Sequence, residues 1–353
     1  MVTVASDVPL APLTTLGIGG PARFFAEFSG SSQAADLLRF AHNEGLKTWL
    51  FGGGSNVIVA DAGLDGLVLR PRCPPDSDGI TIDRRGKFAT VTASAGVVWD
   101  DLVARTVAEN LAGLECLSGI PGLCGAAPMQ NIGAYGQQLS DVLVRAEVLD
   151  TRTLDVRDWS AEDCSFGYRD SALKQAPAGS LLVTRITLTL RSGAGPTITY
   201  PDLRKTIGEG ANLSQAREAV IAIRATKGMV VDARDPASRS AGSFFVNPIV
   251  SQEAANAVAD RLNTDSIPGR PSAMPSWPHG DDVKLSAAWL IERCGMRKGY
   301  GDGRVGLSPK HTLALINRGG ATAVELLAFA AHVQDRVRST TGVELAREPR
   351  ILG

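Results

Sequence analysis

The sequence lacks what a disulfide framework or a structural metal site would need. It contains five cysteines, an odd number, and no two of them form a Cys-x-x-Cys pair. Its four histidines show no metal-ligand spacing such as His-Glu-x-x-His. We therefore predict neither disulfides nor a metal site, and we expect a protein of the reducing cytoplasm.

The chain also lacks an excess of charge of one sign and any long hydrophobic run. Its 36 Lys and Arg nearly balance its 37 Asp and Glu, which gives a formal net charge of −1. Non-specific nucleic-acid binding requires a cationic surface, and no apolar run reaches the ~18–20 residues that cross a membrane. The first residues show no basic segment followed by an apolar one, so no secretory signal is expected. Neither nucleic acid nor a membrane is an expected partner.

What the chain does contain is the composition of a globular protein with several domains. Hydrophobic residues make up 44% and charged residues 21% of its 353 positions, and this length predicts two or three domains. Residues 71–78 are polar and rich in proline, and residues 192–196 read Ser-Gly-Ala-Gly-Pro. Both segments are candidate domain boundaries.

Local periodicity predicts several elements. Ala34, Leu37, Leu38 and Ala41 follow the i, i+3, i+4, i+7 spacing of one helix face. The other expected elements are strands at 48–51 and 57–60, a hairpin over 142–159, an extended surface loop with four prolines over 266–282, a capped helix over 323–337 and an exit strand over 343–352.

The most informative stretch is the central loop, residues 118–136, which reads SGIPGLCGAAPMQNIGAYG. Five of its nineteen residues are glycine, so the backbone rather than the side chains is the expected working surface. Successive exposed N–H groups in such a turn make a concave anion site that suits a diphosphate. A structural crossover is the alternative interpretation of any single glycine-rich stretch.

A second glycine-rich turn, residues 51–56 (FGGGSN), lies upstream and favours a nucleotide cofactor over a structural crossover. It follows the second strand of a strand–helix–strand unit. A dinucleotide fingerprint of the GxGxxG type would instead open a helix after the first strand. A Rossmann fold is therefore not favoured.

Nine short motifs, in the same order along nearly the whole chain, resemble the UDP-N-acetylenolpyruvoylglucosamine reductases, also called UDP-N-acetylmuramate dehydrogenases. The first two are GGGSNVIVAD at 52–61 and SGIPG…NIGAYG in the central loop. The others are FGYRDSALK at 166–174, TYPDL at 199–203, RATKGM at 224–229, SAGSFFVNP at 240–248, VKLSAAWLIE at 283–292, LSPKHTLALIN at 307–317 and the closing REPRILG. Together they are far more specific than any one of them.

The resemblance implies an α+β fold. Two FAD-binding subdomains, of the type shared with vanillyl-alcohol and p-cresol oxidising enzymes, precede a smaller α+β substrate-binding domain. We expect the first subdomain over 1–70 together with the tail 343–353, the second over 71–193, and the substrate domain over 194–342. The TYPDL segment resembles the loop of the subtype whose tyrosine covers the bound substrate, which is Tyr200 here.

The implied activity is the NADPH-dependent reduction of UDP-N-acetylenolpyruvoylglucosamine to UDP-N-acetylmuramate in peptidoglycan precursor synthesis. NADPH reduces FAD, and flavin N5 then gives a hydride to the enolpyruvyl β carbon while the α carbon is protonated. Neither glycine-rich loop contains a histidine that could tether the flavin, so we expect FAD to be non-covalent. The implied partners are the UDP-sugar and NADPH, and we expect a monomer.

Three residues carry the chemistry by resemblance. Arg169 would grip the substrate carboxylate with its guanidinium fork, and the alternative is a surface ion pair with Asp170 or another neighbour. Ser243 would protonate the α carbon, and the alternative is a serine that caps a turn. Glu348 would act as a protonated acid or orient a water, because a second carboxylate beside that of the substrate is disfavoured as an anion. Its alternative is an edge-strand charge.

A larger set of residues is expected to contact the ligands. The expected cofactor-binding residues are Gly52, Gly53, Gly54, Ser55, Asn56, Ser118, Gly119, Ile120, Pro121, Gly122, Gly125, Ala126, Asn131, Gly133, Ala134, Tyr135 and Gly136. The expected substrate-binding residues are Tyr168, Tyr200, Lys227, Asn247, Lys284 and His311. For Lys284 and His311, a solvated surface position is an equally good interpretation.

The chain departs from the family pattern at a few positions. Pro349 stands beside Glu348, where a small aliphatic residue is usual, and it removes a backbone donor. Leu123, Cys124 and Ala126 add bulk beside the expected diphosphate.

Two other functions stay open at this point. One is an FAD-dependent oxidase on the same scaffold, and the other is a catalytically silent protein that binds a nucleotide sugar. The joint presence of Arg169, Ser243 and Glu348 favours the reductase, because binding alone would not require all three.

Overall fold

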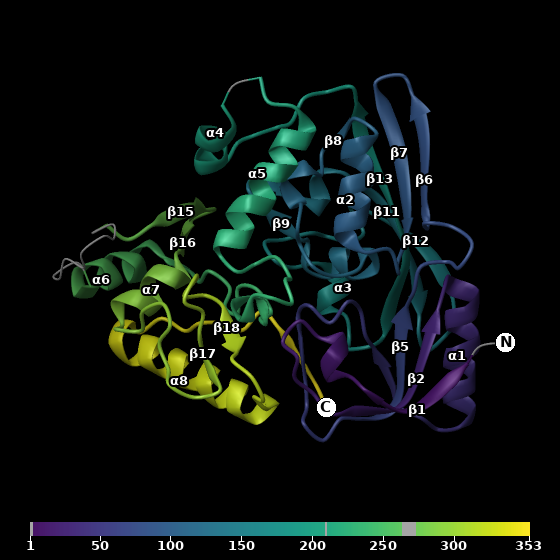
Figure 1. Ribbon diagram of the computed structural model, residues 1–353, viewed down its shortest axis with the longest axis horizontal. Helices are drawn as coiled ribbons and strands as arrows, with labels where there is room; N and C mark the ends of the chain where they lie inside the picture. Colours follow the sequence, from purple (N-terminus) through teal and green to yellow (C-terminus); the bar gives the residue numbers. More distant parts are fainter. Residues whose placement is uncertain (1–2, 209, 263–272) are drawn as a thin grey trace.

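The computed structural model describes residues 3–208, 210–262 and 273–353 (Figure 1). In Figure 1 the N-terminal sheet, in purple, and the C-terminal helices, in green and yellow, lie at opposite sides of the molecule. The larger middle sheet and its helix α2 (Trp99–Ala108) occupy the upper part of the same view.

The N-terminal part comprises β1 (Val4–Pro9), β2 (Pro21–Phe28), α1 (Ser31–Asn43), β3 (Thr48–Leu50), β4 (Val57–Val59) and β5 (Leu64–Pro71). Four of these strands form a sheet in the order β1-β2-β5-β3. β2 and β3 both pair in parallel with β5, and α1 supplies the crossover between them. The four helix residues predicted to share one face are all buried, in a cluster with Leu67 and Leu69. The predicted helix is therefore confirmed.

The middle part comprises β6 (Ile80–Arg85), β7 (Phe88–Ser94), α2, β8 (Leu111–Ala112), β9 (Gly133–Ala134), β10 (Gln137–Gln138), β11 (Leu143–Asp150), β12 (Val156–Ser160), α3 (Ala172–Gln175) and β13 (Leu181–Ser192). Its main sheet is antiparallel, with the order β12-β11-β13-β7-β6. The predicted hairpin is confirmed as β11 and β12. Trp99 and Leu102 of α2 are buried with Val91 of β7, so this helix covers one face of the sheet.

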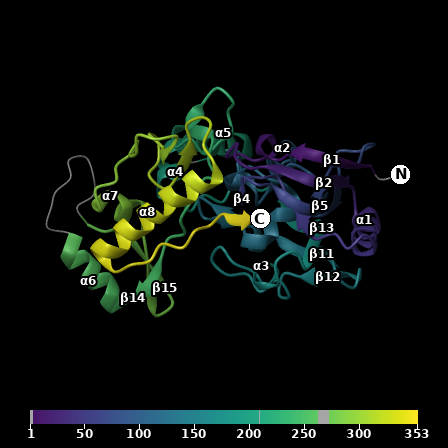
Figure 2. The same ribbon diagram turned by 90° about the horizontal axis from the view of Figure 1, so that it is seen from below.

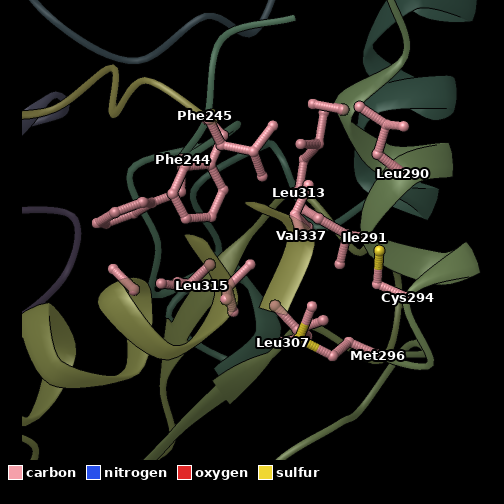
Figure 3. Close-up of a cluster of buried hydrophobic side chains, with 14 of the residues drawn as sticks. Phe244, Phe245, Leu290, Ile291, Cys294, Met296, Leu307, Leu313, Leu315 and Val337 are labelled. Carbon is pink, nitrogen blue, oxygen red and sulfur yellow. The ribbon is translucent and has the colours of Figure 1, made fainter. Parts of the chain in front are cut away.

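The C-terminal part comprises α4 (Pro201–Ile207), α5 (Leu213–Thr226), β14 (Ile249–Ser251), α6 (Gln252–Leu262), β15 (Ser276–His279), β16 (Asp282–Leu285), α7 (Ala287–Arg293), β17 (Val305–Leu307), β18 (Leu315–Asn317), α8 (Ala323–Thr341) and β19 (Arg350–Leu352). Its core gathers apolar side chains of α6, α7 and α8 around Phe244 and Phe245 (Figure 3). Thr322 and Glu325 form the predicted capping box at the start of α8.

The end of the chain returns to the first glycine-rich turn. β19 pairs in parallel with β4, which directly follows that turn. Figure 2 shows the yellow tail leaving α8 and ending beside β4. This pairing brings Glu348, two residues before β19, to the turn. Of the predicted exit strand over 343–352, only residues 350–352 form a strand.

The predicted surface loop over 266–282 is wrong where the structure describes it, and residues 263–272 lie outside the described part. β15 and β16 form an antiparallel pair there. In the order β14-β16-β15, β15 is an edge strand. An edge strand tolerates a proline such as Pro278, which has no N–H to donate to a neighbour. The prolines were therefore a misleading signal.

Within the described ranges, no helix is both long and apolar enough to cross a membrane. The same residues include no group of three or more His, Cys, Asp or Glu placed to hold a metal ion. The domain boundaries near residues 70 and 193 stay a prediction.

Candidate active site

A pocket of about 280 Å³ is lined by residues from all three parts of the chain. Arg169, Ser243 and Glu348, the three residues predicted to be catalytic, all line it. The other predicted ligand contacts on its wall are Ser55, Asn56, Ile120, Pro121, Gly133, Ala134, Tyr135, Tyr200, Lys227 and His311. The pocket thus joins residues that are far apart in the sequence.

The two glycine-rich segments touch each other at the edge of this pocket. A Cβ atom on Gly53 would lie 2.7 Å from the Cα of Gly122, and one on Gly122 would lie 3.0 Å from the Ser55 hydroxyl. A Cβ atom on Gly54, which has φ of +67°, would lie 1.9 Å from the Leu13 carbonyl oxygen. Glycine is therefore required at these positions by the close approach of protein atoms, independently of any ligand.

The first glycine-rich turn fits a diphosphate. The consecutive backbone amides of residues 52–56 donate no hydrogen bond to any group in the described part of the chain. The buried side-chain oxygen of Asn56 also has no hydrogen-bond partner there, whereas its amide donates to Gln130 at 2.6 Å. Unpaired buried polar groups are rare in folded proteins and mark a site for a ligand. An anionic cofactor group would satisfy the amides.

The central loop offers fewer amides than its sequence suggests. The amides of Gly125 and Ala126 donate to backbone carbonyls within the protein. The Gly119 amide donates to the Asp100 carboxylate at 2.6 Å. The N–H groups of these three residues are therefore not available to an anion. The expected run of donors therefore lies in the first turn instead.

Several other predicted cofactor residues are held by the protein itself. The buried hydroxyl of Ser118 donates to the Glu115 carbonyl, and the Asn131 side chain bonds Ser140. Gly136 has φ of +86°, and a Cβ atom on it would lie 2.0 Å from the Thr199 hydroxyl. None of these residues lines the pocket, nor do Gly52–Gly54, Gly119, Gly122, Gly125 or Ala126.

Arg169 is held in an unusual backbone conformation. Its φ is +55°, in the left-handed region that side-chain-bearing residues rarely adopt. Its Nη2 donates to the Gly133 carbonyl at 2.9 Å, and its Nε lies 4.0 Å from Oε1 of Glu348. Asp170 instead accepts from Gln175 at 2.7 Å. The described part of the chain shows no ion pair between Arg169 and Asp170, and the role of Arg169 stays a prediction.

Glu348 is placed to keep a proton. Its side chain is 11% exposed, and its backbone N–H donates to the Phe244 carbonyl at 2.9 Å. Burial raises the pKa of its carboxyl group, and the nearby charges of Arg169 and Lys174 offset this only in part. The net pKa is above the ordinary value, so the carboxyl holds its proton to a higher pH than a solvated glutamate does.

The turn that carries Ser243 is anchored by the two buried aromatic residues that follow it. Gly242 before it has φ of +70°, and Phe244 and Phe245 after it are at most 1% exposed (Figure 3). The described part of the chain contains no hydrogen bond to the Ser243 hydroxyl. Because its neighbours fix the backbone, the hydroxyl is presented to the pocket by packing and stays available to a ligand.

One wall of the pocket carries the cations Arg224 and Lys227 together with His311. Burial, with the charges of Lys227 and Lys298, lowers the pKa of His311 to about 4. Nδ1 of this imidazole accepts from the Leu313 N–H at 3.1 Å, so the neutral ring carries its proton on Nε2. Arg224 also lines the pocket and was not predicted, although its motif RATKGM was noted. Its buried Nε has no hydrogen-bond partner among the described residues.

Tyr200 lies at the rim, next to the central loop. Its ring stands perpendicular to that of Tyr135, with centroids 5.3 Å apart. The segment leading to it is anchored by Glu115, a fully buried carboxylate that accepts from the Thr197 N–H at 3.0 Å and from Gln137 at 2.8 Å. The base of the tyrosine segment is therefore fixed to residues that flank the central loop on both sides.

The remaining predicted substrate residues form a second group outside the pocket lining. The ammonium of Lys284 lies 4.3 Å from the ring centroid of Tyr168, and the Tyr168 phenol interacts with Asn247. The Asn247 side-chain oxygen accepts from the Ala287 N–H at 3.0 Å. Lys284 is thus not an isolated surface lysine, but the structure does not bring this group into the pocket.

The fold accommodates three of the four departures from the family pattern, Pro349, Leu123 and Cys124, whereas the fourth residue, Ala126, is exposed. The amides of Glu348 and Arg350 donate to Phe244 and Asn56, and the residue between them would point to the other side of the extended chain. Pro349 therefore removes no hydrogen bond from this pairing. Leu123 and Cys124 are buried, so their bulk is directed into the protein rather than into the pocket.

The chain is similar to two protein-family models and to full-length relatives. The family model described as "FAD binding domain" matches residues 22–153, and that described as "UDP-N-acetylenolpyruvoylglucosamine reductase, C-terminal domain" matches residues 235–352. The UDP-N-acetylenolpyruvoylglucosamine reductase of Saccharopolyspora erythraea is 45% identical over 96% of this chain and 93% of its own length. That of Thermobifida fusca is 42% identical over 99% of this chain and 98% of its own length.

A solved structure agrees with these matches. The UDP-N-acetylenolpyruvylglucosamine reductase of Thermus caldophilus superposes with a TM-score of 0.66 at 25% identity, over 100% of this chain and 99% of that chain. The predicted α+β fold, with a two-part FAD-binding region followed by a smaller α+β region, is thereby confirmed. The chain belongs to the UDP-N-acetylenolpyruvoylglucosamine reductase family.

Proposed function

We propose that this protein reduces UDP-N-acetylenolpyruvoylglucosamine to UDP-N-acetylmuramate in peptidoglycan precursor synthesis, with NADPH as reductant and FAD as a non-covalent cofactor. One observation carries the proposal: Arg169, Ser243 and Glu348 meet in one pocket that borders the first glycine-rich turn. Family membership and the match to an FAD binding domain support the same substrate and cofactor.

The residues of the first glycine-rich turn would hold the cofactor diphosphate with the amides of 52–56, and Ile120 and Pro121 of the central loop would border it. FAD, when bound, accepts a hydride from NADPH and supplies it to the enolpyruvyl group. The absence of histidine from both loops supports a non-covalent flavin.

Arg169 would bind the carboxylate of the enolpyruvyl group. Hydride addition at the β carbon moves negative charge onto this carboxylate, and a preorganised cation lowers the energy of that charge. The bond from Arg169 to the Gly133 carbonyl fixes the plane of the guanidinium before the substrate arrives. The left-handed backbone of Arg169 is consistent with a position held for function.

Ser243 would donate the proton that the α carbon needs, and hydride plus proton together saturate the carbon–carbon double bond. Glu348, with its raised pKa, would stay protonated beside the substrate carboxylate and could return a proton to the serine oxygen. Its protonated form also avoids repulsion between two carboxylates.

Lys227 and His311 would contact the diphosphate or sugar in the pocket, and Tyr200 would cover them. Tyr168, Asn247 and Lys284 would contact a part of the substrate that extends beyond the pocket. We propose the domain division 1–70 with 343–353, 71–193 and 194–342, and a cytoplasmic monomer.

Two steps of one anaerobic experiment test the function. NADPH should bleach the FAD-loaded protein, and UDP-N-acetylenolpyruvoylglucosamine should then restore the oxidised spectrum. Reduction of the flavin by an alcohol and its reoxidation by oxygen, without reoxidation by the enolpyruvyl sugar, would favour an oxidase. Failure of NADPH to bleach the flavin would favour a silent binding protein.

A further inference from the structure

We propose that Lys174 is a positioning residue for the proposed reduction, which holds the turn that carries Arg169 and sets the charge beside Glu348. The proposal rests on the proposed function for its kinetic consequences. The contacts that support it are independent of that function.

Lys174 is fixed at three atoms. Its Nζ donates to the backbone carbonyl of Arg169 at 2.6 Å, and its N–H donates to the Ser171 hydroxyl at 3.1 Å. Its carbonyl accepts a short hydrogen bond from the Arg350 guanidinium. Ser171 in turn donates to the Met129 carbonyl at 2.8 Å. Two of these contacts involve the backbone of Lys174, so the bond from Nζ to the Arg169 carbonyl is the one that the side chain contributes.

These contacts join the two segments on which the site depends. Arg169 lies in a tight turn closed by hydrogen bonds between Gly167 and Asp170, directly before α3. Glu348 lies two residues before β19, where Arg350 also pairs with β4. Lys174 on α3 bonds the first segment through Nζ and the second through its carbonyl. Displacing Lys174 would therefore change the separation of Arg169 and Glu348.

The bond to the Arg169 carbonyl also orients a strained peptide. At a φ of +55° this residue is not held by helix or sheet pairing, so its neighbours must fix it. A charged ammonium is a stronger donor to a carbonyl than a neutral group is. Loss of this donor should let Arg169 relax toward ordinary backbone angles and move its guanidinium away from Gly133.

Lys174 acts on Glu348 through charge rather than through a direct ion pair. The charged and titratable side chains that influence this carboxyl from neighbouring segments are Arg169, Lys174 and the phenol of Tyr168. Both cations lower the pKa of Glu348 and so oppose the effect of burial. Removing Lys174 leaves burial opposed by Arg169 alone, and the pKa of Glu348 should rise further.

The test uses Lys174→Met, the rescue variant Lys174→Arg, and Lys87→Met as a matched change of an exposed lysine outside the pocket lining. Carbon-13 NMR of the full-length protein with labelled glutamate carboxyls would follow the titration of Glu348, identified by its loss in Glu348→Gln. Stopped-flow measurements would follow reduction by NADPH and reoxidation by the enolpyruvyl sugar in the FAD-loaded protein.

We expect Glu348 to titrate at higher pH in Lys174→Met than in the wild type. Reoxidation should slow by about 10- to 100-fold, the cost of a misplaced reacting group, while reduction by NADPH stays unchanged. Lys174→Arg should restore both properties, and Lys87→Met should alter neither. If Lys174→Met does not fold, Lys174→Gln gives the same comparison.

The proposal would be overturned if Glu348 titrated at the same pH in Lys174→Met as in the wild type. It would also be overturned if Lys174→Arg were reoxidised no faster than Lys174→Met. The titration needs no substrate, so it decides the role of Lys174 even if the wild-type protein fails to reduce the enolpyruvyl sugar. That second failure would count against the proposed function alone.

Discussion

Replacing Arg169 is the most direct perturbation of charge in the pocket. Nη2 donates one of its two hydrogens to the Gly133 carbonyl, so its second hydrogen together with that of Nε or Nη1 would form the fork for the substrate carboxylate. Loss of one preorganised donor to a developing anion costs about 2.7–4 kcal/mol, or 10²–10³-fold in rate. Arg169→Ala removes the whole fork, so the enolpyruvyl half-reaction should slow by about 10³-fold or more.

Arg169→Lys separates charge from geometry. Lysine keeps the cation but cannot bond the Gly133 carbonyl and grip a carboxylate bidentately at the same time. We expect a loss of about 10–10²-fold, between the wild type and the alanine variant. Stopped-flow reoxidation of the reduced protein by the enolpyruvyl sugar measures this step. A lysine variant as fast as the wild type would refute the assignment of Arg169 as a bidentate clamp.

Arg169→Gly provides the matched control for stability. Glycine adopts a φ of +55° without the cost of about 1–2 kcal/mol that a side chain carries there. The glycine variant should therefore unfold at a temperature no lower than that of Arg169→Ala, although both should be slow enzymes. A glycine variant clearly less stable than the alanine variant would contradict the view that the backbone of Arg169 is strained.

Four further outcomes are expected. Ser243→Ala should be reduced by NADPH at the wild-type rate, while its reoxidation by the enolpyruvyl sugar falls by about 10²–10⁴-fold; equal slowing of both steps would make Ser243 a positioning residue. Acid precipitation of the FAD-loaded protein should leave the flavin in the supernatant, and colour in the pellet would contradict non-covalent binding. Protease cleavage near Tyr200 should be slower with the UDP-sugar than without it, because a closed tyrosine segment is protected. Asp100→Asn should lower the unfolding temperature, because Asp100 accepts bidentate bonds of 2.6 and 2.8 Å from Arg217. Burial alone would raise the pKa of Asp100, but these bonds and the one from Gly119 outweigh it and lower the pKa. The difference in unfolding temperature between the variant and the wild type should therefore be largest above about pH 5 and should disappear as the pH falls through the lowered pKa. A difference in unfolding temperature that grows as the pH falls would contradict a stabilising role for the pair of Asp100 and Arg217.

The elements that the sequence predicted correctly are those set by local patterns. The apolar stripe on α1 and the turn between β11 and β12 depend on residues only a few positions apart. The predicted capping box of α8 is equally local, since Thr322 and Glu325 satisfy each other's backbone groups. Tertiary context did not override these signals.

The composition of the pocket was predictable only through the resemblance to a family. Glu348 reaches the first glycine-rich turn because β19 pairs with β4, nearly the whole chain away in sequence. No periodicity or spacing in either segment specifies that pairing. The resemblance supplied the partners, and the structure supplied the contacts between them.

Other features could not be predicted because they depend on which partner each group finds. The Gly119 amide looked available to an anion, but the Asp100 carboxylate occupies it. Arg224 belongs to a noted motif, yet only the fold shows that its guanidinium lines the pocket. Pro278 led to the prediction of a loop, because proline is unfavourable in a central strand and nothing in the sequence marks β15 as an edge strand.

In the proposed reaction this pocket adds a hydride and a proton across the enolpyruvyl double bond. A single anaerobic turnover tests this, in which the NADPH-reduced, FAD-loaded protein is mixed with UDP-N-acetylenolpyruvoylglucosamine and the sugar is analysed by mass spectrometry. We expect stoichiometric reoxidation of the flavin and a product heavier than the substrate by two hydrogen atoms, with the α-carbon hydrogen drawn from solvent. An unchanged sugar, with the flavin still reduced, would contradict it.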